Sequence, residues 1–261
     1  MPSRPAHKKR RRKGRGKTVL SPWWVLGAVA LVALAVVLPH LLAVRNPDKG
    51  AAVPPGYRHF MVDLSHNNPR TVVWDSLRVV LDATGRTSRD LAYAQEILPL
   101  SHVVMKATEG ESHLDRHFAA WWAEAGAAGL SRGAYHFFRS SKDPSRQAQH
   151  YIGQVSLSHR DLPPILDIET AHGGCTREEL NRKALQWLQL VQKHYGRRPI
   201  VYTGDSFAQE WLSASITEHY PLWIARYSEE PPRTALWQYW QFTDKAVVHG
   251  ISGTVDLSVI P

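Results

Sequence analysis

Two acidic residues two positions apart, Asp167 and Glu169, have a spacing that suggests chemistry. They follow the apolar run Pro163–Leu166, which is typical of a buried strand. On a strand both side chains leave the same face, with Cα atoms about 6.5–7 Å apart. Carboxylates this close raise each other's proton affinity, and the one in the more apolar setting keeps its proton near neutral pH. Such a pair meets the requirement for cleaving a glycosidic bond, in which one acid protonates the leaving oxygen and the other stabilises or attacks the cationic carbon.

Two further acids, Asp63 and Asp256, also fall at the ends of predicted strands. Acids at such positions can equally be solvated or cap the next helix. Asp167 fits that alternative less well, because an apolar strand carries it and Glu169 into the fold rather than leaving them at a loop tip. The four acids are therefore the candidate catalytic residues.

Apolar runs of strand length alternate with segments of helical period over most of the chain. Both faces of these runs are apolar, which is typical of buried parallel strands covered by helices. The predicted strands of this part are 60–64, 102–107, 133–138, 164–169 and 199–203, and the clearest helices are 114–128 and 177–195, the second opening with the capping pair Thr176 and Glu179.

Past residue 220 the pattern changes to short strands at 222–225, 237–242 and 255–257, without room for helices between them. The sequence therefore predicts an α/β fold: an irregular, TIM-barrel-like (β/α) barrel of about five β/α units followed by about three β-strands. The carboxyl ends of the strands form the active face of such barrels. Residues 79–98 are predicted to be helix and loop.

Aromatic residues give a second indication, because the chain contains ten Trp and nine Tyr. Several fall on predicted strands, and sugar rings stack on such side chains, although strand aromatics more often fill a core. They are Tyr135, Tyr202, Trp223, Trp237 and Tyr239.

The amino-terminal part predicts a membrane anchor. Residues 1–18 form a basic tail, and residues 19–44 are apolar enough to span a membrane, with a Trp pair at the interface. A cleaved signal peptide is the alternative, and the protein would then be secreted; the long basic region and the missing Ala-x-Ala site favour an uncleaved anchor. The tail is expected in the cytoplasm and the rest outside it. Residues 45–58 read as a linker, and the folded domain as 59–261.

The net charge of +9 comes from the tail, because residues 1–17 hold nine of the 32 basic residues. The other 23 basic residues balance 23 acidic ones, so nucleic acid is not an expected partner. No metal or other cofactor is expected: His113, Asp115 and His117 lack a third ligand at fixed spacing, and there is no phosphate loop or Gly-x-Ser-x-Gly elbow. The single Cys175 permits no intramolecular disulfide. We expect a monomer.

The sequence resembles glycoside hydrolase family 25, the Chalaropsis-type lysozymes, over roughly residues 60–260. Seven segments match the family's motifs in order: Val62–Ser65, Lys106–Gly110, Gly133–Phe137, Leu166–Glu169, Val201–Gly204, Leu222–Tyr227 and Gly250–Leu257.

The resemblance implies hydrolysis of the β-1,4 bond between N-acetylmuramic acid and N-acetylglucosamine in peptidoglycan glycan strands. Glu169 matches the proton donor and Asp167 the acid that assists at the anomeric carbon, as nucleophile or stabiliser, while Asp63 and Asp256 match two further acids of the site. The assistance can also come from the substrate's acetamido group. The family's groove lining corresponds to Lys106, Glu109, Tyr135 and Tyr202, to which the aromatic pattern adds Trp223.

Two departures from the family pattern concern the region after the first strand. His66–Pro69 replace the usual glycine, and the segment between Asp75 and Val103 is longer than usual, so an extra element is expected to border one end of the groove. Two other functions stay open at this level: a membrane-tethered glycan-binding module without activity, and a chitinase-like hydrolase of N-acetylglucosamine polymers.

Overall fold

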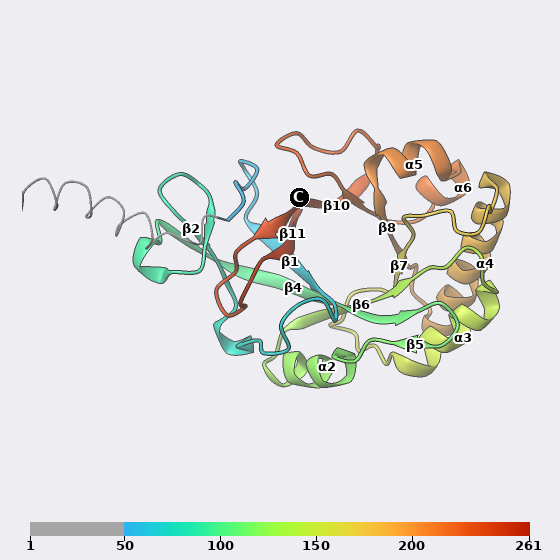
Figure 1. Ribbon diagram of the computed structural model, residues 1–261, viewed down its shortest axis with the longest axis horizontal. Helices are drawn as coiled ribbons and strands as arrows, with labels where there is room; N and C mark the ends of the chain where they lie inside the picture. Colours follow the sequence, from blue (N-terminus) through green and yellow to red (C-terminus); the bar gives the residue numbers. More distant parts are fainter. Residues whose placement is uncertain (1–49) are drawn as a thin grey trace, which may run out of the picture. The chain divides into compact units, whose positions relative to one another are not determined.

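The computed structural model describes residues 50–261, and these form a closed barrel (Figure 1). Its strands are β1 (His59–Leu64), β4 (Glu96–Glu109), β6 (Ser131–Phe137), β7 (Ile165–Asp167), β8 (Ile200–Gly204), β9 (Leu222–Ala225), β10 (Trp237–Ala246) and β11 (Val255–Ile260). In the described part the strands from β1 to β10 around this barrel run parallel, and β11 lies antiparallel between β10 and β1. The predicted fold class is confirmed: five strands of the β/α type are followed by three more.

The ring closes through β1, which pairs with β4 on one side and with β11 on the other. Its register places Asp63 opposite Asp256 of β11 and opposite Val104 of β4. Closure therefore brings acids from the first and the last barrel strand together.

Side chains inside the barrel change from apolar to polar along each strand. Successive residues of a strand point to opposite faces, so every second residue faces inward. A buried cluster inside the barrel includes Met61, Val104, Ile165 and Ile200. The residue two positions further along these strands is Asp63, Lys106, Asp167 or Tyr202. The apolar positions fill the barrel, and the polar positions collect at the carboxyl ends of the strands.

Helices cover the outer face of the parallel strands, where a larger apolar core lies between the two layers (Figure 1). They are α2 (Phe118–Ala127), α3 (Pro144–Gln154), α4 (Arg177–Tyr195), α5 (Asp205–Trp211) and α6 (Ala214–Thr217). In α4 the Thr176 side chain caps the first turn by accepting from the Glu179 backbone N–H at 3.2 Å. Gly196 ends the helix at φ 65°, a left-handed conformation that favours glycine.

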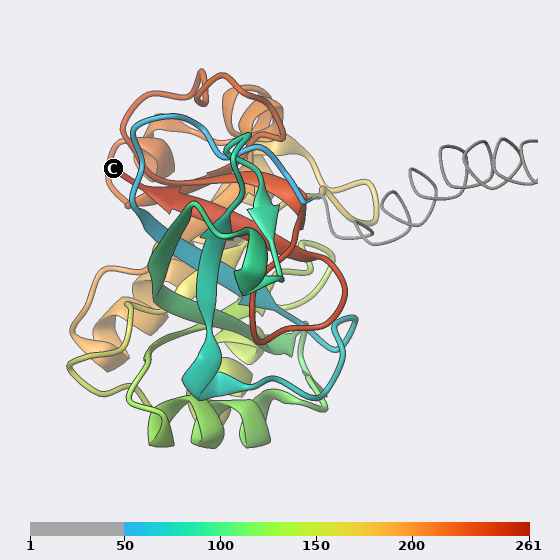
Figure 2. The same ribbon diagram turned by 90° about the vertical axis from the view of Figure 1, so that its left-hand side faces the viewer.

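Residues 79–98 differ from the predicted helix and loop. They form β2 (Arg78–Leu81), β3 (Thr87–Ser88) and the 3₁₀ turn η2 (Leu91–Tyr93), and β2 pairs antiparallel with the first residues of β4. A second 3₁₀ turn, η1 (Trp74–Ser76), precedes them, and the short β5 (His113–Leu114) pairs with the end of β4. Figure 2 faces the side that carries β2. The turn-forming run from Asp82 to Gly85 reverses the chain before a helix can form, because Gly85 adopts φ 72° and donates its N–H to Asp82.

The folded unit begins before His59. Ala52 forms an antiparallel bridge with Arg86, and the Gly50 N–H donates to the Thr87 carbonyl at 3.0 Å. The ring of Tyr57 packs edge-on against Trp240, with centroids 6.1 Å apart. Residues 50–58 of the predicted 45–58 linker are thus part of the domain. Their backbone pairs with Arg86 and Thr87 before Pro54, and Tyr57 packs against the barrel after it.

No helix among residues 50–261 combines the length and apolar character needed to cross a membrane. The predicted basic tail (1–18), the predicted anchor (19–44) and the first part of the linker lie outside the described residues.

Candidate active site

A cavity of roughly 260 Å³ opens at the carboxyl ends of the barrel strands. All four predicted catalytic acids line it. The complete lining is Asp63, Ser65, Asn67, Lys106, Tyr135, Phe137, Asp167, Glu169, Tyr202, Trp223, Tyr227 and Asp256. Among these residues of the described chain, Lys106 is the single cationic side chain, so the acids greatly outnumber the cations that could balance them.

Strand β7 and the residues just after it deliver the acid pair. Asp167 is the last residue of β7, and the Ile168 N–H still donates to the Tyr202 carbonyl at 2.9 Å, which continues the ladder past the strand. Ile168 is completely buried on the outer face. Asp167 and Glu169 therefore both face the cavity, as their spacing predicted.

The two acids differ in their access to solvent. Asp167 is 5% exposed, and its Oδ1 has no hydrogen-bond partner within the described chain, whereas Glu169 is exposed at the cavity wall. Burial raises the pKa of Asp167 well above its ordinary value, and the charge of Glu169 adds to the rise. Burial also raises the pKa of Glu169, but a hydrogen bond with Asp167 and the charge of Lys106 oppose it.

A hydrogen bond between two carboxyl groups requires one proton between them. Asp167 is the more buried partner, and the neighbouring Glu169 adds to the rise of its pKa, which favours a proton on Asp167. The sequence criterion, that the more crowded acid keeps the proton, thus points to Asp167 rather than Glu169 in the free chain. The reason is that Glu169 stands where solvent reaches it, which strand spacing does not reveal.

Asp63 is held by an amide that the sequence analysis did not single out. Gln241 of β10 is buried and donates from Nε2 to Asp63 Oδ2 at 2.9 Å. Its Oε1 accepts from the hydroxyls of Tyr202 at 2.9 Å and Tyr227 at 3.0 Å. These partners fix the orientation of the amide. Burial and the charge of Asp256 raise the pKa of Asp63 well above its ordinary value, and the Gln241 bond opposes the rise.

Asp256 lies opposite Asp63 in the β1–β11 ladder. Burial raises its pKa to about 6, and the charges of Asp244 and Glu169 contribute. The cavity thus combines four acids whose pKa values are all raised, which is the electrostatic pattern of many catalytic sites.

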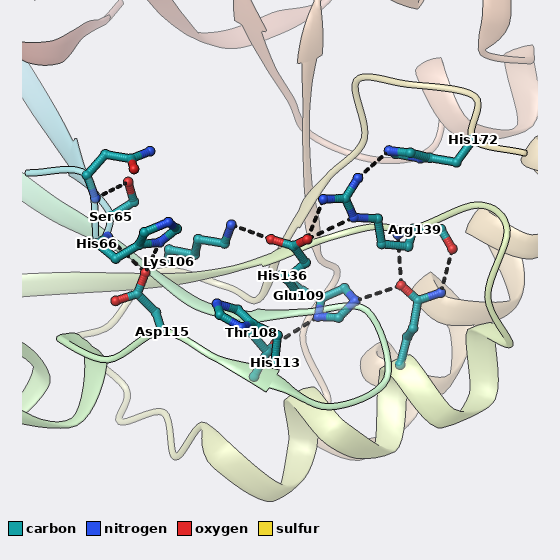
Figure 3. A network of polar contacts seen from close by, with 12 residues as sticks. Ser65, His66, Lys106, Thr108, Glu109, His113, Asp115, His136, Arg139 and His172 are labelled. Atoms are coloured by element: carbon teal, nitrogen blue, oxygen red, sulfur yellow. Dashed lines mark hydrogen bonds and ion pairs between the residues drawn. The ribbon is translucent and has the colours of Figure 1, made fainter.

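Lys106 and Glu109 of β4 form an ion pair beside the cavity (Figure 3). Lys106 Nζ donates to Glu109 Oε2 at 2.6 Å and lies 4.9 Å from the centre of the Phe137 ring. Burial alone would raise the pKa of Glu109, but hydrogen bonds from Lys106 and Arg139 lower it to about 2. Lys106 lines the cavity, whereas Glu109 is not among the lining residues.

The three aromatic residues predicted to contact substrate all line the cavity. Tyr202 and Trp223 are buried and pack edge to face, with ring centroids 4.6 Å apart. The Trp223 indole N–H donates to the Ser258 hydroxyl at 2.9 Å. Tyr135 is half-buried. Trp237 and Tyr239, the other strand aromatics, do not line it.

The loop after β1 keeps a compact turn without the family's glycine. The Asn68 side chain accepts from the Ser65 N–H at 2.8 Å, and the Asn68 N–H donates to the Ser65 carbonyl at 2.9 Å. Asp115 Oδ2 binds both the backbone N–H and the Nδ1 of His66, each at 2.9 Å. Asp115 therefore holds this loop. Residues 50–261 contain no group of three His, Cys, Asp or Glu side chains arranged to hold a metal.

Four lining residues were absent from the sequence-based site: Ser65, Asn67, Phe137 and Tyr227. Gln241, which lies behind the lining, was absent as well. Gln241 was hard to single out, because the aromatic run Trp237–Phe242 contains a second amide, Gln238. Tyr227 lies two residues after the predicted strand 222–225. Its side chain is 56% exposed at the cavity while its hydroxyl is fixed by Gln241.

A barrel that places a pair of carboxyl groups at the carboxyl ends of its strands has the arrangement that cleavage of a glycosidic bond requires. The sequence pattern of Glycosyl hydrolases family 25 matches residues 89–251. The chain belongs to this family, and the resemblance drawn from the motifs is confirmed.

Individual relatives agree with this assignment. The chain is 38% identical over 162 residues to the uncharacterized protein YegX of Escherichia coli, an alignment that covers 61% of this chain and 59% of YegX. It is 27% identical to Lysozyme M1 of Streptomyces globisporus, covering 97% of this chain and 93% of that one. A family 25 glycosyl hydrolase from Bacillus anthracis shares the fold, with TM-score 0.65, 21% identity, and coverage of 82% of this chain and 94% of that one.

Proposed function

We propose that this chain hydrolyses the β-1,4 bond between N-acetylmuramic acid and N-acetylglucosamine in peptidoglycan. The observation that carries the proposal is the pair Asp167 and Glu169, which lines one cavity together with two further acids and whose pKa values are both raised by burial. Family membership and the similarity to Lysozyme M1 support the choice of substrate.

In the proposed reaction the proton of Asp167 passes along the shared hydrogen bond to Glu169 as substrate enters. Glu169, the exposed partner, then donates this proton to the glycosidic oxygen as the bond to the anomeric carbon breaks. The transfer leaves Asp167 ionised at the moment when positive charge develops on the sugar. Transfer of this one proton therefore protonates Glu169, the acid, and ionises Asp167, the stabilising anion, in the same step.

The buried carboxylate of Asp167 then assists at the anomeric carbon, either directly or by orienting the substrate's acetamido group. Asp63 and Asp256 are proposed to bind sugar hydroxyls or the attacking water; burial and the neighbouring acids raise the pKa of both. Water adds to the anomeric carbon and returns a proton to the pair, which restores the starting state.

The aromatic side chains of the cavity are proposed to pack against the CH face of a sugar ring. Tyr135, Tyr202 and Trp223 line the cavity, and the exposed ring of Tyr227 lies at the same wall. Sugar CH faces pack well against such rings. Lys106 is proposed to contact the substrate beside the acid pair; Glu109 serves it as an ionic partner.

The test is to incubate residues 48–261, which form one compact unit, with purified peptidoglycan. We expect new reducing ends, and mass spectrometry should find N-acetylmuramic acid at them. Binding to glycan strands without bond cleavage would instead support a glycan-binding module. Cleavage of chitin oligomers with peptidoglycan left intact would support a chitinase-like enzyme.

A membrane location is a separate part of the proposal and rests on sequence. The basic residues 1–18 and the apolar residues 19–44 support an anchor with the amino terminus in the cytoplasm and residues 50–261 outside, facing the wall. If the apolar segment is cleaved, the enzyme is secreted. Fractionation of cells expressing the full chain distinguishes these: an anchored protein stays with membranes after alkaline washing.

A further inference from the structure

A chain of polar contacts links the end of β4 to the loops after β6 and β7 (Figure 3). Arg139, just after β6, donates from Nε to Glu109 Oε1 at 2.8 Å and contacts the same oxygen through a second nitrogen. Its remaining nitrogen lies 2.6 Å from His172 Nε2, in the loop that follows Glu169. Because Glu109 in turn holds Lys106, one guanidinium joins the end of β4 to the loops after β6 and β7.

The contact with His172 defines the state of that ring. A guanidinium has donors and no acceptor, so Nε2 must accept and the ring must be neutral with its proton on Nδ1. Burial, and next the charge of Arg139, lower the pKa of His172. The His172 backbone N–H also donates to the Ser140 hydroxyl at 2.6 Å, which fixes the loop at a second point.

Helix α3 holds the backbone of Arg139 through one side chain. Buried Gln147 of α3 accepts from the Arg139 N–H at 2.9 Å and donates to its carbonyl at 3.0 Å. The Oε1 of the same amide lies 3.2 Å from Nε2 of His136, a fully buried ring. These two hydrogen bonds fix the backbone of Arg139. The guanidinium therefore starts from a defined position, from which it contacts both Glu109 and His172.

We propose that Arg139 is a positioning residue for the acid pair: bound to Glu109 and to neutral His172, it fixes Lys106 and the loop behind Glu169, and sets the pH at which the pair loses its proton. This inference rests on the proposed function.

The net charge of Lys106, Glu109 and Arg139 predicts the direction in which each substitution shifts the pKa of the acid pair. Lys106, Glu109 and Arg139 together carry one positive charge, and Lys106 lowers the pKa of both Asp167 and Glu169. Removing Arg139 leaves the group neutral, so the pair should hold its proton to higher pH. Removing the charge of Glu109 leaves two positive charges, so the pair should release its proton at lower pH.

Other titratable groups face the pair from the remaining barrel strands and their ends. They are Asp63 of β1, Tyr135 of β6, Tyr202 of β8, Tyr227 after β9 and Asp256 of β11. None of them is altered by the substitutions below, so they form a constant background.

The test is the pH profile of kcat for wild type, Arg139→Gln, Glu109→Gln and Arg139→Lys. We expect the basic limb to move up by about 0.5 pH unit in Arg139→Gln and down by a similar amount in Glu109→Gln. Arg139→Lys keeps the charge, so its limb should stay near wild type, while its kcat falls because a single ammonium cannot bind Glu109 and His172 in the same fork geometry. Lys142→Gln removes a positive charge from the same loop at an exposed site and should leave the profile unchanged.

A purely structural role would lower activity at all pH values without opposite shifts, and that result would overturn the proposal. Carbon-13 NMR titration of the Asp167 and Glu169 carboxyls in the substrate-free protein provides a readout independent of activity. Opposite shifts there in an inactive wild type would reject the proposed function and keep this inference, whereas unmoved midpoints in an active enzyme would reject this inference alone.

Discussion

Asp63 and Asp205 have the same solvent exposure, but their pKa values are shifted in opposite directions. Each is 8% exposed, and each lies at the carboxyl end of a barrel strand, Asp63 in β1 and Asp205 just after β8. Burial raises the pKa of Asp63 well above its ordinary value. For Asp205 burial acts in the same direction, but hydrogen bonds from Thr234, Arg233 and Arg226 lower the pKa to about 2.

One difference between the two carboxylates lies in the donors that surround them. Asp205 accepts from the Thr234 hydroxyl at 2.7 Å, the Thr234 N–H at 2.9 Å, the Arg226 guanidinium at 3.0 Å and the Arg233 N–H at 3.1 Å. Asp63 accepts from the Gln241 amide and faces other acids. Burial therefore does not mark a reactive carboxylate by itself. Asp205, which accepts several hydrogen bonds, holds the loop after β9. Asp63, which has fewer donors, retains affinity for a proton or a substrate hydroxyl.

Removing the proton-transfer group should have the largest effect. We expect Glu169→Gln to lower kcat on peptidoglycan by on the order of 10²-fold or more, because general acid catalysis typically contributes that much. Glu178→Gln, at an exposed position in the first turn of α4, is the matched control and should keep full activity. Reducing-end release measures both. An active Glu169→Gln enzyme would mean that another cavity acid donates the proton.

The stabilities of Asp205→Asn and Asp63→Asn compare the two regions directly. Asp205→Asn should lower the free energy of unfolding at pH 7 by about 2–3 kcal/mol, because hydrogen bonds to a charged acceptor are lost and an N–H donor then faces other donors. Asp63→Asn should change it by less than about 1 kcal/mol or raise it, since the Asn carbonyl can still accept from Gln241 while like-charge repulsion is relieved. Urea denaturation measures both, and equal losses would remove the distinction between the two sites.

The pH dependence of stability should separate the regions over different ranges. The folded pKa of Asp256 is raised from 3.8 to about 6, so its stabilising contribution is complete below pH 4 and is lost as the pH rises through 6. Asp205, whose folded pKa is lowered to about 2, contributes stability that is present above pH 4 and is lost as the pH falls toward 2.

Asp256→Asn should therefore remove a decline on the order of 2 kcal/mol in the free energy of unfolding between pH 4 and 7. Urea denaturation at several pH values measures it. Asp75→Asn, an exposed acid of η1, is the control and should follow the wild-type curve. A wild-type stability that does not fall over this range would contradict the raised pKa.

The smallest effect is expected at the edge of the cavity. Tyr227→Phe keeps the exposed ring but loses the hydroxyl bond to Gln241, so kcat/KM should fall a few-fold, corresponding to about 1 kcal/mol. Steady-state kinetics on soluble glycan fragments measures it. Tyr93→Phe, on η2 and equally open to solvent, is the control and should leave kcat/KM unchanged.

The sequence was most informative where one physical requirement dominates. The barrel strands were predictable because buried parallel strands must be apolar on both faces. Asp63 and Asp167 were predictable because they come near the carboxyl ends of such strands, whereas Asp256 lies at the amino end of the antiparallel β11. The β2–β3 region was not, since β3 has two residues and its pairing depends on distant Gly50 and Val247. Segments this short carry too little periodicity to distinguish a strand from a loop.

Within the site, residue types were more predictable than charge states. Nothing local in the sequence tells Asp63 from Asp205, because their donors come from β10 in one case and from the loop after β9 in the other. The location of the shared proton depends on the solvent exposure of Glu169, which the packing of the surrounding loops determines. Gln241 was overlooked because an uncharged amide within an aromatic strand resembles a core position. The catalytic roles themselves stay predictions until they are tested.

The seating of β11 between β1 and β10 has a consequence during synthesis. Asp63 leaves the ribosome well before Asp256, and the two acids meet through the pairing of β1 with β11. A nascent or carboxy-terminally clipped chain lacks one wall of the cavity and leaves the edges of β1 and β10 open. Hydrolytic capability should therefore appear abruptly, at the moment the ring closes, rather than grow as the polypeptide lengthens.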